Sequence, residues 1–95
     1  MRNKESQIYQ AATLRGIVDL LDKGPASMFE IELIMHLSHR MAKRLCRKLE
    51  QAGIICHPPI HGASPKNAPE LRWKLSDAFL HGKIEFDAND LSREA

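Results

Sequence analysis

The sequence predicts a mainly α-helical domain with a small β-hairpin, and three observations support this. Apolar residues recur at helical spacing in three windows, over about 4–23, 28–36 and 38–52. The second and third windows are separated only by a short turn, as in a helix-turn-helix. Strand-like segments then flank a proline-rich loop, which predicts a hairpin over about 54–75. We therefore expect one domain over residues 1–80 and a separate tail over 81–95.

The first predicted helix supplies apolar side chains for a core. They follow helical spacing and are Ile8, Ala11, Leu14, Ile17, Val18 and Leu21. Gly24 and Pro25 end this helix, since proline cannot continue it. We interpret it as a supporting helix, and part of its apolar surface is compatible with the seam of a homodimer.

The second predicted helix begins with a capping box. Ser27 and Glu30 have the S-x-x-E spacing in which the serine accepts from the Glu30 amide and the glutamate reaches back. Just before it, Ala26 is a candidate for a very short strand. Phe29 and Leu33, with either Ile34 or His36–Leu37, are expected to face the core.

The third predicted helix has an apolar stripe and a basic side. Ser38 is a candidate N-cap, and Gly53 is a candidate residue for the left-handed turn after the helix. The apolar stripe is Met41, Ala42, Leu45, Leu49 and Ala52. The basic side carries Arg40, Lys43, Arg44, Arg47 and Lys48. A helix face with so many cations is expected to contact an anionic partner.

The predicted hairpin begins with a strand over Ile54–His57. Four of the five prolines of the chain lie in the following loop, which excludes both helix and sheet interior there. The returning strand alternates, so Leu71, Trp73 and Leu75 are expected in the core. Arg72 and Lys74 are then expected to face outward.

Charge is distributed unevenly along the chain, although its net value is only +2. Residues 38–74 carry eight basic and two acidic side chains, whereas residues 75–95 carry two basic and five acidic ones. A positive field confined to one part of the chain is typical of a nucleic-acid contact surface. We expect the acidic tail to weaken DNA binding.

The segment Leu49–Ile55, L-E-Q-A-G-I-I, resembles the end of the recognition helix in bacterial winged helix-turn-helix transcriptional regulators. With the preceding basic helix and the L-R-W-K-L strand, the resemblance covers about Tyr9 to Leu75. The layout is similar to the small stand-alone regulators of pilus operons. The resemblance implies three helices plus a wing, and sequence-specific binding of double-stranded DNA in transcription regulation.

By this resemblance, helix 38–52 enters the major groove and the wing, residues 57–70, lies on the backbone or minor groove. Arg40 and Arg44 are the best candidates for guanine, because a planar guanidinium reaches both O6 and N7. The remaining expected DNA contacts come from the helix and the wing strands. They are Ser38, His39, Lys43, Arg47, Lys48, Lys66, Arg72 and Lys74.

Other classes of function have weaker support in the sequence. Cys46, Cys56, His57 and His61 lack metal-site spacing, so we expect no metal and no cofactor. Neither a nucleophile–base pair nor a phosphate loop is recognisable, so we expect no enzyme. The alternative is a winged-helix adaptor that binds a protein partner and modulates a larger DNA-binding or phage- or plasmid-related assembly.

The expected location follows from what the sequence lacks. No apolar run approaches the roughly 20 residues of a membrane span. The segment M-R-N-K-E-S-Q is not followed by the apolar region of a signal peptide. We therefore expect a cytoplasmic, nucleoid-associated protein with reduced cysteines and no membrane contact.

Overall fold

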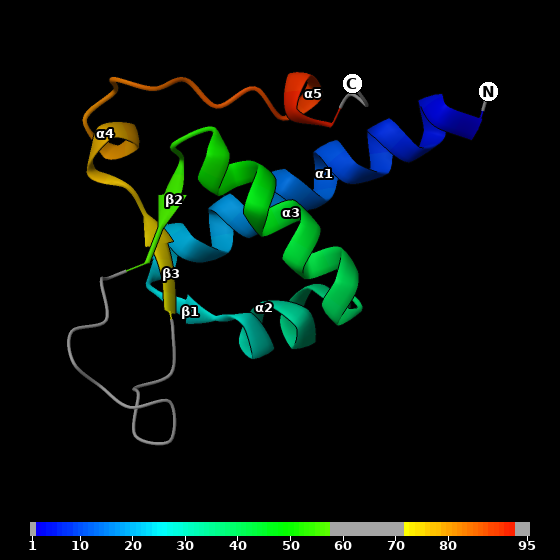
Figure 1. The fold of residues 1–95 in the computed structure, drawn as a ribbon, viewed down its shortest axis with the longest axis horizontal. Helices are drawn as coiled ribbons and strands as arrows, with labels where there is room; N and C mark the ends of the chain where they lie inside the picture. Colours follow the sequence, from blue (N-terminus) through cyan, green and yellow to red (C-terminus); the bar gives the residue numbers. More distant parts are fainter. Residues whose placement is uncertain (1, 58–71, 93–95) are drawn as a thin grey trace.

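Helices dominate the computed structural model, which describes residues 2–57 and 72–92, with side chains from residue 7 onward (Figure 1). The elements are α1 (Arg2–Lys23), β1 (Ala26–Ser27), α2 (Met28–Met35), α3 (His39–Gln51), β2 (Ile55–Cys56), β3 (Arg72–Leu75), α4 (Asp77–Leu80) and α5 (Ala88–Leu91). The three strands form one small antiparallel sheet. The predicted class, mainly α with a small β component, is confirmed at this level.

The sheet places β3 between the other two strands. Ala26 of β1 is opposite Trp73, and Ile55 of β2 is opposite Leu75. The short strand predicted at Ala26 is therefore confirmed. The strand predicted over Ile54–His57 is reduced to two residues, because the Ile54 amide donates to the Leu49 carbonyl at 3.0 Å and so completes the end of α3.

The returning strand alternates as predicted where the structure describes it. Arg72 and Lys74 are exposed and Leu75 is buried, whereas Leu71 lies outside the described residues. Trp73 is half-buried and packs against the core, so the expectation that it lies in the core is confirmed in part.

The capping box at the start of α2 is confirmed. Ser27 Oγ accepts from the Glu30 amide at 3.1 Å, and Glu30 Oε1 accepts from the Ser27 amide at 2.8 Å. Arg72 Nη1 donates to the same Oε1 at 2.9 Å. The Ser27 amide, followed by the Arg72 charge, lowers the pKa of Glu30 below its ordinary value of 4.5. The ionised Glu30 carboxylate therefore stabilises the fold above pH 4.5, and this contribution is lost as the pH falls through the lowered pKa.

The inward face of α2 differs from the predicted one. Ile31 is fully buried, whereas Phe29 is 66% and Leu33 is 65% exposed, and Ile34 is also exposed. Six of the eight residues of α2 are apolar, so the sequence pattern has no polar side from which the orientation can be read. The orientation is instead set by contact with α1, where the Met35 side chain lies over Gly16.

Helix α3 begins and ends as the sequence predicts. Ser38 Oγ accepts from the Met41 amide at 3.2 Å, and Gly53 has a φ of 81° after the last turn. This positive φ favours glycine, and a Cβ there would also lie 2.7 Å from Ile84 Cδ1, so the Ile84 side chain would have to shift. The buried side of α3 is formed by Ala42, Leu45, Cys46 and Leu49.

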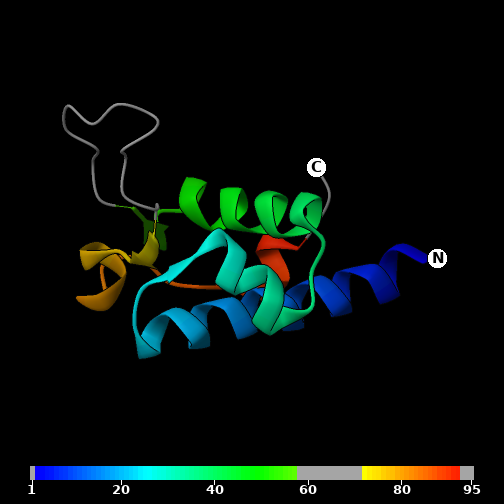
Figure 2. The same ribbon diagram turned by 90° about the horizontal axis from the view of Figure 1, so that it is seen from below.

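Residues 84–92, which we call the C-terminal strap, pack against the body of the protein. Ala88 and Ser92 are buried, and Ile84, Phe86 and Leu91 pack against the core. Figure 2 shows α5 lying between α1 and α3, and α1 and α5 are in contact. The expectation that the segment after residue 80 forms a tail with little packing is therefore wrong for residues 84–92, because α1 offers these residues an apolar surface.

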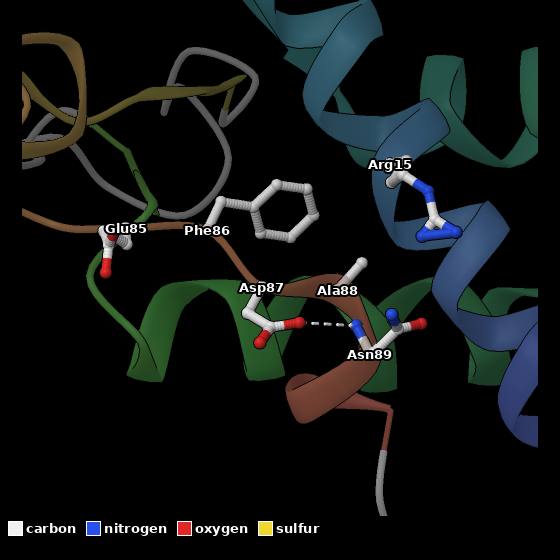
Figure 3. Close-up of a pocket in the computed structure, with 6 residues that line it drawn as sticks. All are labelled: Arg15, Glu85, Phe86, Asp87, Ala88 and Asn89. Carbon is white, nitrogen blue, oxygen red and sulfur yellow. Dashed lines mark hydrogen bonds between the residues drawn. The ribbon is translucent and has the colours of Figure 1, made fainter.

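A hollow of about 470 Å³ lies along the seam between the strap and α1 (Figure 3). Its lining combines Arg15 from α1 with Glu85 and Asp87 from the strap. Asp87 Oδ1 accepts from the Asn89 amide at 3.1 Å and so caps α5. Asp87 thus fixes the strap locally, and its carboxylate is committed to the helix end.

Candidate nucleic-acid interface

The polar side chains of α3 face three different parts of the structure. Its central stripe faces outward, one flank faces the sheet, and the other flank faces α1 and the strap. The division follows from helical spacing, because residues separated by three or four positions share a face. The predicted DNA contacts on α3 therefore do not act as one uniform surface.

The outward stripe contains four exposed cations. Arg40, Lys43, Arg44 and Arg47 lie at spacings of three or four residues and, with Lys48 and Gln51, line a hollow of about 320 Å³. We call this the outer hollow. Five basic side chains around one shallow hollow produce a concentrated positive potential, which favours an anionic ligand.

Lys48 directs its ammonium group away from this stripe. Its Nζ donates to the Leu91 carbonyl at 3.1 Å and to Gln10 Oε1 at 3.5 Å. Lys48 is half-buried and connects α3 with both α1 and the C-terminal strap. The structure thus places it in the packing of the domain, although its stem still lines the outer hollow.

The flank of α3 that faces the sheet borders a second hollow, of about 420 Å³, which we call the α3–sheet hollow. Helix α3 contributes His39, Lys43, Arg47 and Glu50 to it, and the sheet side contributes His57 and Trp73. His39 Nδ1 lies 2.7 Å from Glu32 Oε2, and His57 Nε2 lies 3.7 Å from Glu50 Oε2. Lys43 and Arg47 line both hollows.

Sequence reasoning missed the pairing of His57 with Trp73. The two rings form a T-shaped contact with centroids 4.9 Å apart. Ile55 is opposite Leu75 and Cys56 is opposite Lys74, so the next position along places His57 beside Trp73. This pairing can be predicted from the sequence only if the strand register is known, and the separation of His57 and Trp73 along the chain leaves the register undetermined.

The other predicted contacts have different surroundings. Ser38 is committed to the N-cap of α3, and His39 is paired with Glu32. Arg72 is exposed but pairs with Glu30, while Lys74 is exposed on β3. Lys66 and the predicted wing loop lie outside the described residues. The structure therefore brings Arg40, Lys43, Arg44 and Arg47 together around the outer hollow, whereas Arg72 and Lys74 lie on β3.

The two cysteines are separate free thiols. Cys46 is fully buried in α3, and burial raises the pKa of its thiol to about 12. Cys56 is half-buried in β2. Among the residues that the structure describes, no three His, Cys, Asp or Glu side chains form a group able to hold a metal ion.

We expect iodoacetamide to modify Cys56 and spare Cys46 in the folded protein at about pH 8, because Cys46 is buried and its thiol stays protonated. Mass spectrometry of the labelled chain measures this directly. A Cys56→Ser variant is the control, and it should take label only after unfolding in urea. Equal labelling of both thiols in the folded chain would contradict the buried position of Cys46.

No family model matches the chain, and neither the curated proteins nor the solved structures give a match. Within residues 2–57 and 72–92, no helix has both the length and the apolar character that crossing a membrane requires.

Proposed function

We propose that this protein is a small winged helix-turn-helix regulator that binds double-stranded DNA through the outward stripe of α3. The observation that supports this proposal is the grouping of Arg40, Lys43, Arg44 and Arg47 on one exposed helix face. A helix fits the major groove, where arginine distinguishes guanine by bidentate hydrogen bonds. Arg40 and Arg44 take this role, and Lys43 and Arg47 contact phosphates.

The order of the elements supports the same proposal. A helix, a short strand, two helices joined by a short turn and two antiparallel strands follow one another along the chain. This is the order expected of a winged helix-turn-helix. The N-cap of α3 and the left-handed conformation of His36 before it fix the turn between α2 and α3. The presentation of α3 thus depends on backbone geometry that the sequence encodes locally.

Fluorescence anisotropy with labelled duplexes over a salt series tests the proposal. If Lys43 and Arg47 contact one phosphate each, log K is expected to fall with log salt at a slope of about −1.8, which is roughly 12-fold between about 50 and 200 mM salt. Selection of bound duplexes from a random pool then identifies the preferred site. A folded protein that binds no duplex near 50 mM salt would refute direct DNA binding.

The exposed side of α2 favours a second candidate function, that of a protein-binding adaptor. Phe29, Leu33 and Ile34 are all more than half exposed on one short helix. Exposed apolar patches of this kind often mark protein contacts. The absence of duplex binding in the salt series, together with association through this patch, would support the adaptor in place of the regulator.

A further inference from the structure

The α3–sheet hollow has the chemistry of a ligand site. Its volume of about 420 Å³ lies within the usual range for small-molecule pockets. Its lining includes two rings from the sheet side, His57 and Trp73, and two cations from α3, Lys43 and Arg47. Met28, His39 and Glu50 complete the lining. An aromatic surface beside positive charge suits a ligand that is both flat and anionic.

The aromatic part of this lining comes from the sheet side. Trp73 lies in the central strand β3, opposite Ala26 of β1, and His57 packs against its ring at 4.9 Å. Strand pairing therefore fixes the backbone of Trp73, and the T-shaped contact with His57 restricts its ring. Because Trp73 is only half-buried, it can present a fixed surface on which another flat ring stacks.

Along α3, the side chains that line the hollow change from basic to acidic. Lys43 and Arg47 lie one turn apart, and Glu50 follows on the next turn with its carboxylate 3.7 Å from His57. The two cations suit a phosphate, since charge-assisted hydrogen bonds to phosphate are strong. Glu50 accepts hydrogen bonds and so suits an amino group, as carboxylates do with the amino group of cytosine.

We propose that the α3–sheet hollow binds a nucleotide, with its base on Trp73, its phosphate on Lys43 and Arg47, and an exocyclic amino group of the base on Glu50. The nucleotide comes either from solution or from an unpaired residue at a DNA strand end. Lys43 and Arg47 are shared with the outer hollow, so an occupied site competes with duplex DNA for these two cations. Binding of a free nucleotide does not depend on the proposed DNA-binding function.

Trp73 provides the readout, because it is the only tryptophan of the chain and lines the hollow. Titration of the full chain with adenosine monophosphate is expected to quench its fluorescence saturably. Adenosine without phosphate should bind about ten- to a hundredfold more weakly, because it lacks the charged hydrogen bonds to Lys43 and Arg47. Uridine monophosphate, which has no amino group, should bind about fivefold more weakly.

Variants separate the hollow from general attraction to a positive protein. Lys43→Ala should weaken binding of adenosine monophosphate about tenfold or more. Lys83→Ala, which removes an exposed lysine outside the hollow, should leave the affinity unchanged. Circular dichroism confirms that each variant is folded, and the comparison of the three ligands on the unchanged protein needs no variant.

Two duplexes, one blunt and one with a single unpaired adenosine, distinguish the sources of the nucleotide. Stronger quenching by the unpaired end assigns the site to DNA ends as well as to free nucleotides, and equal quenching assigns it to free nucleotides alone. The proposal is overturned if adenosine monophosphate gives no saturable quenching, or if adenosine and adenosine monophosphate bind equally. The nucleotide titrations contain no DNA, so a negative result there would not affect the proposal of duplex binding. Equally, a failure to bind duplex DNA would not affect the proposal of a nucleotide site.

Discussion

Truncation after Leu80 is expected to remove a large part of the stability of the domain. The deletion removes buried Ala88 and Ser92 together with Ile84, Phe86 and Leu91, which pack against the core. Full burial of one large apolar side chain is worth about 1.5–3 kcal/mol, so three that are partly buried, with Ala88, account for about 4–6 kcal/mol. A domain of this size has about 5–15 kcal/mol of stability in total, so the loss is about a third of the upper figure and the whole of the lower one.

Urea denaturation followed by circular dichroism measures this effect on the full and the truncated chain. A Leu91→Ala variant is the graded counterpart and should lose about 1–2 kcal/mol, because Leu91 is only half-buried. An unchanged unfolding midpoint in the truncated chain would show that the strap does not contribute to the fold.

Because the strap is part of the fold, the effect of its acidic side chains on DNA affinity cannot be tested by truncation. The sequence suggests that removal of an acidic tail would strengthen DNA binding, but here the deletion would remove part of the core as well. Glu85→Gln is a better test, because Glu85 is exposed, whereas Asp87 caps α5. The expectation that acidic charge in this segment weakens binding stays a prediction.

The helix boundaries were predictable because their determinants are local. Ser27, Ser38 and Gly53 each act within a few residues of their own position, and the structure uses all three as the sequence indicates. The burial of Leu45 and Leu49 was predictable for a related reason, since a polar side of α3 fixes the orientation of its apolar stripe. Local chemistry and amphipathic spacing therefore account for most of the helical framework.

Contacts between distant segments were not predictable in the same way. The strap has no helical repeat, and the burial of Ala88 depends on the surface that α1 presents to it. Lys48 resembles its basic neighbours in the sequence, yet the nearby Leu91 carbonyl determines where its ammonium group lies. The pairing of His57 with Trp73 depends on the register between two strands that are far apart in the sequence. Each of these features requires the tertiary arrangement.

The division of α3 into an outward stripe and a strap-facing flank leads to the second prediction with a large effect. The double variant Arg40→Ala/Arg44→Ala should weaken duplex binding about 30- to 100-fold near 50 mM salt and relax the preference for guanine, while the salt slope changes little. Its unfolding free energy should change by no more than about 0.5 kcal/mol, because both side chains are exposed on the helix surface.

Lys48→Ala is the matched comparison from the same helix, and the opposite result is expected. The variant loses the hydrogen bonds from Nζ to Leu91 and Gln10, so the protein should be destabilised by about 1–2 kcal/mol. Its duplex affinity should change less than threefold, because its ammonium group faces the strap. Anisotropy and urea denaturation on both variants give the two readouts. If Lys48→Ala weakened DNA binding as much as the double arginine variant does, the whole basic side of α3 would act as one surface, and the outward stripe would not be the DNA-binding face.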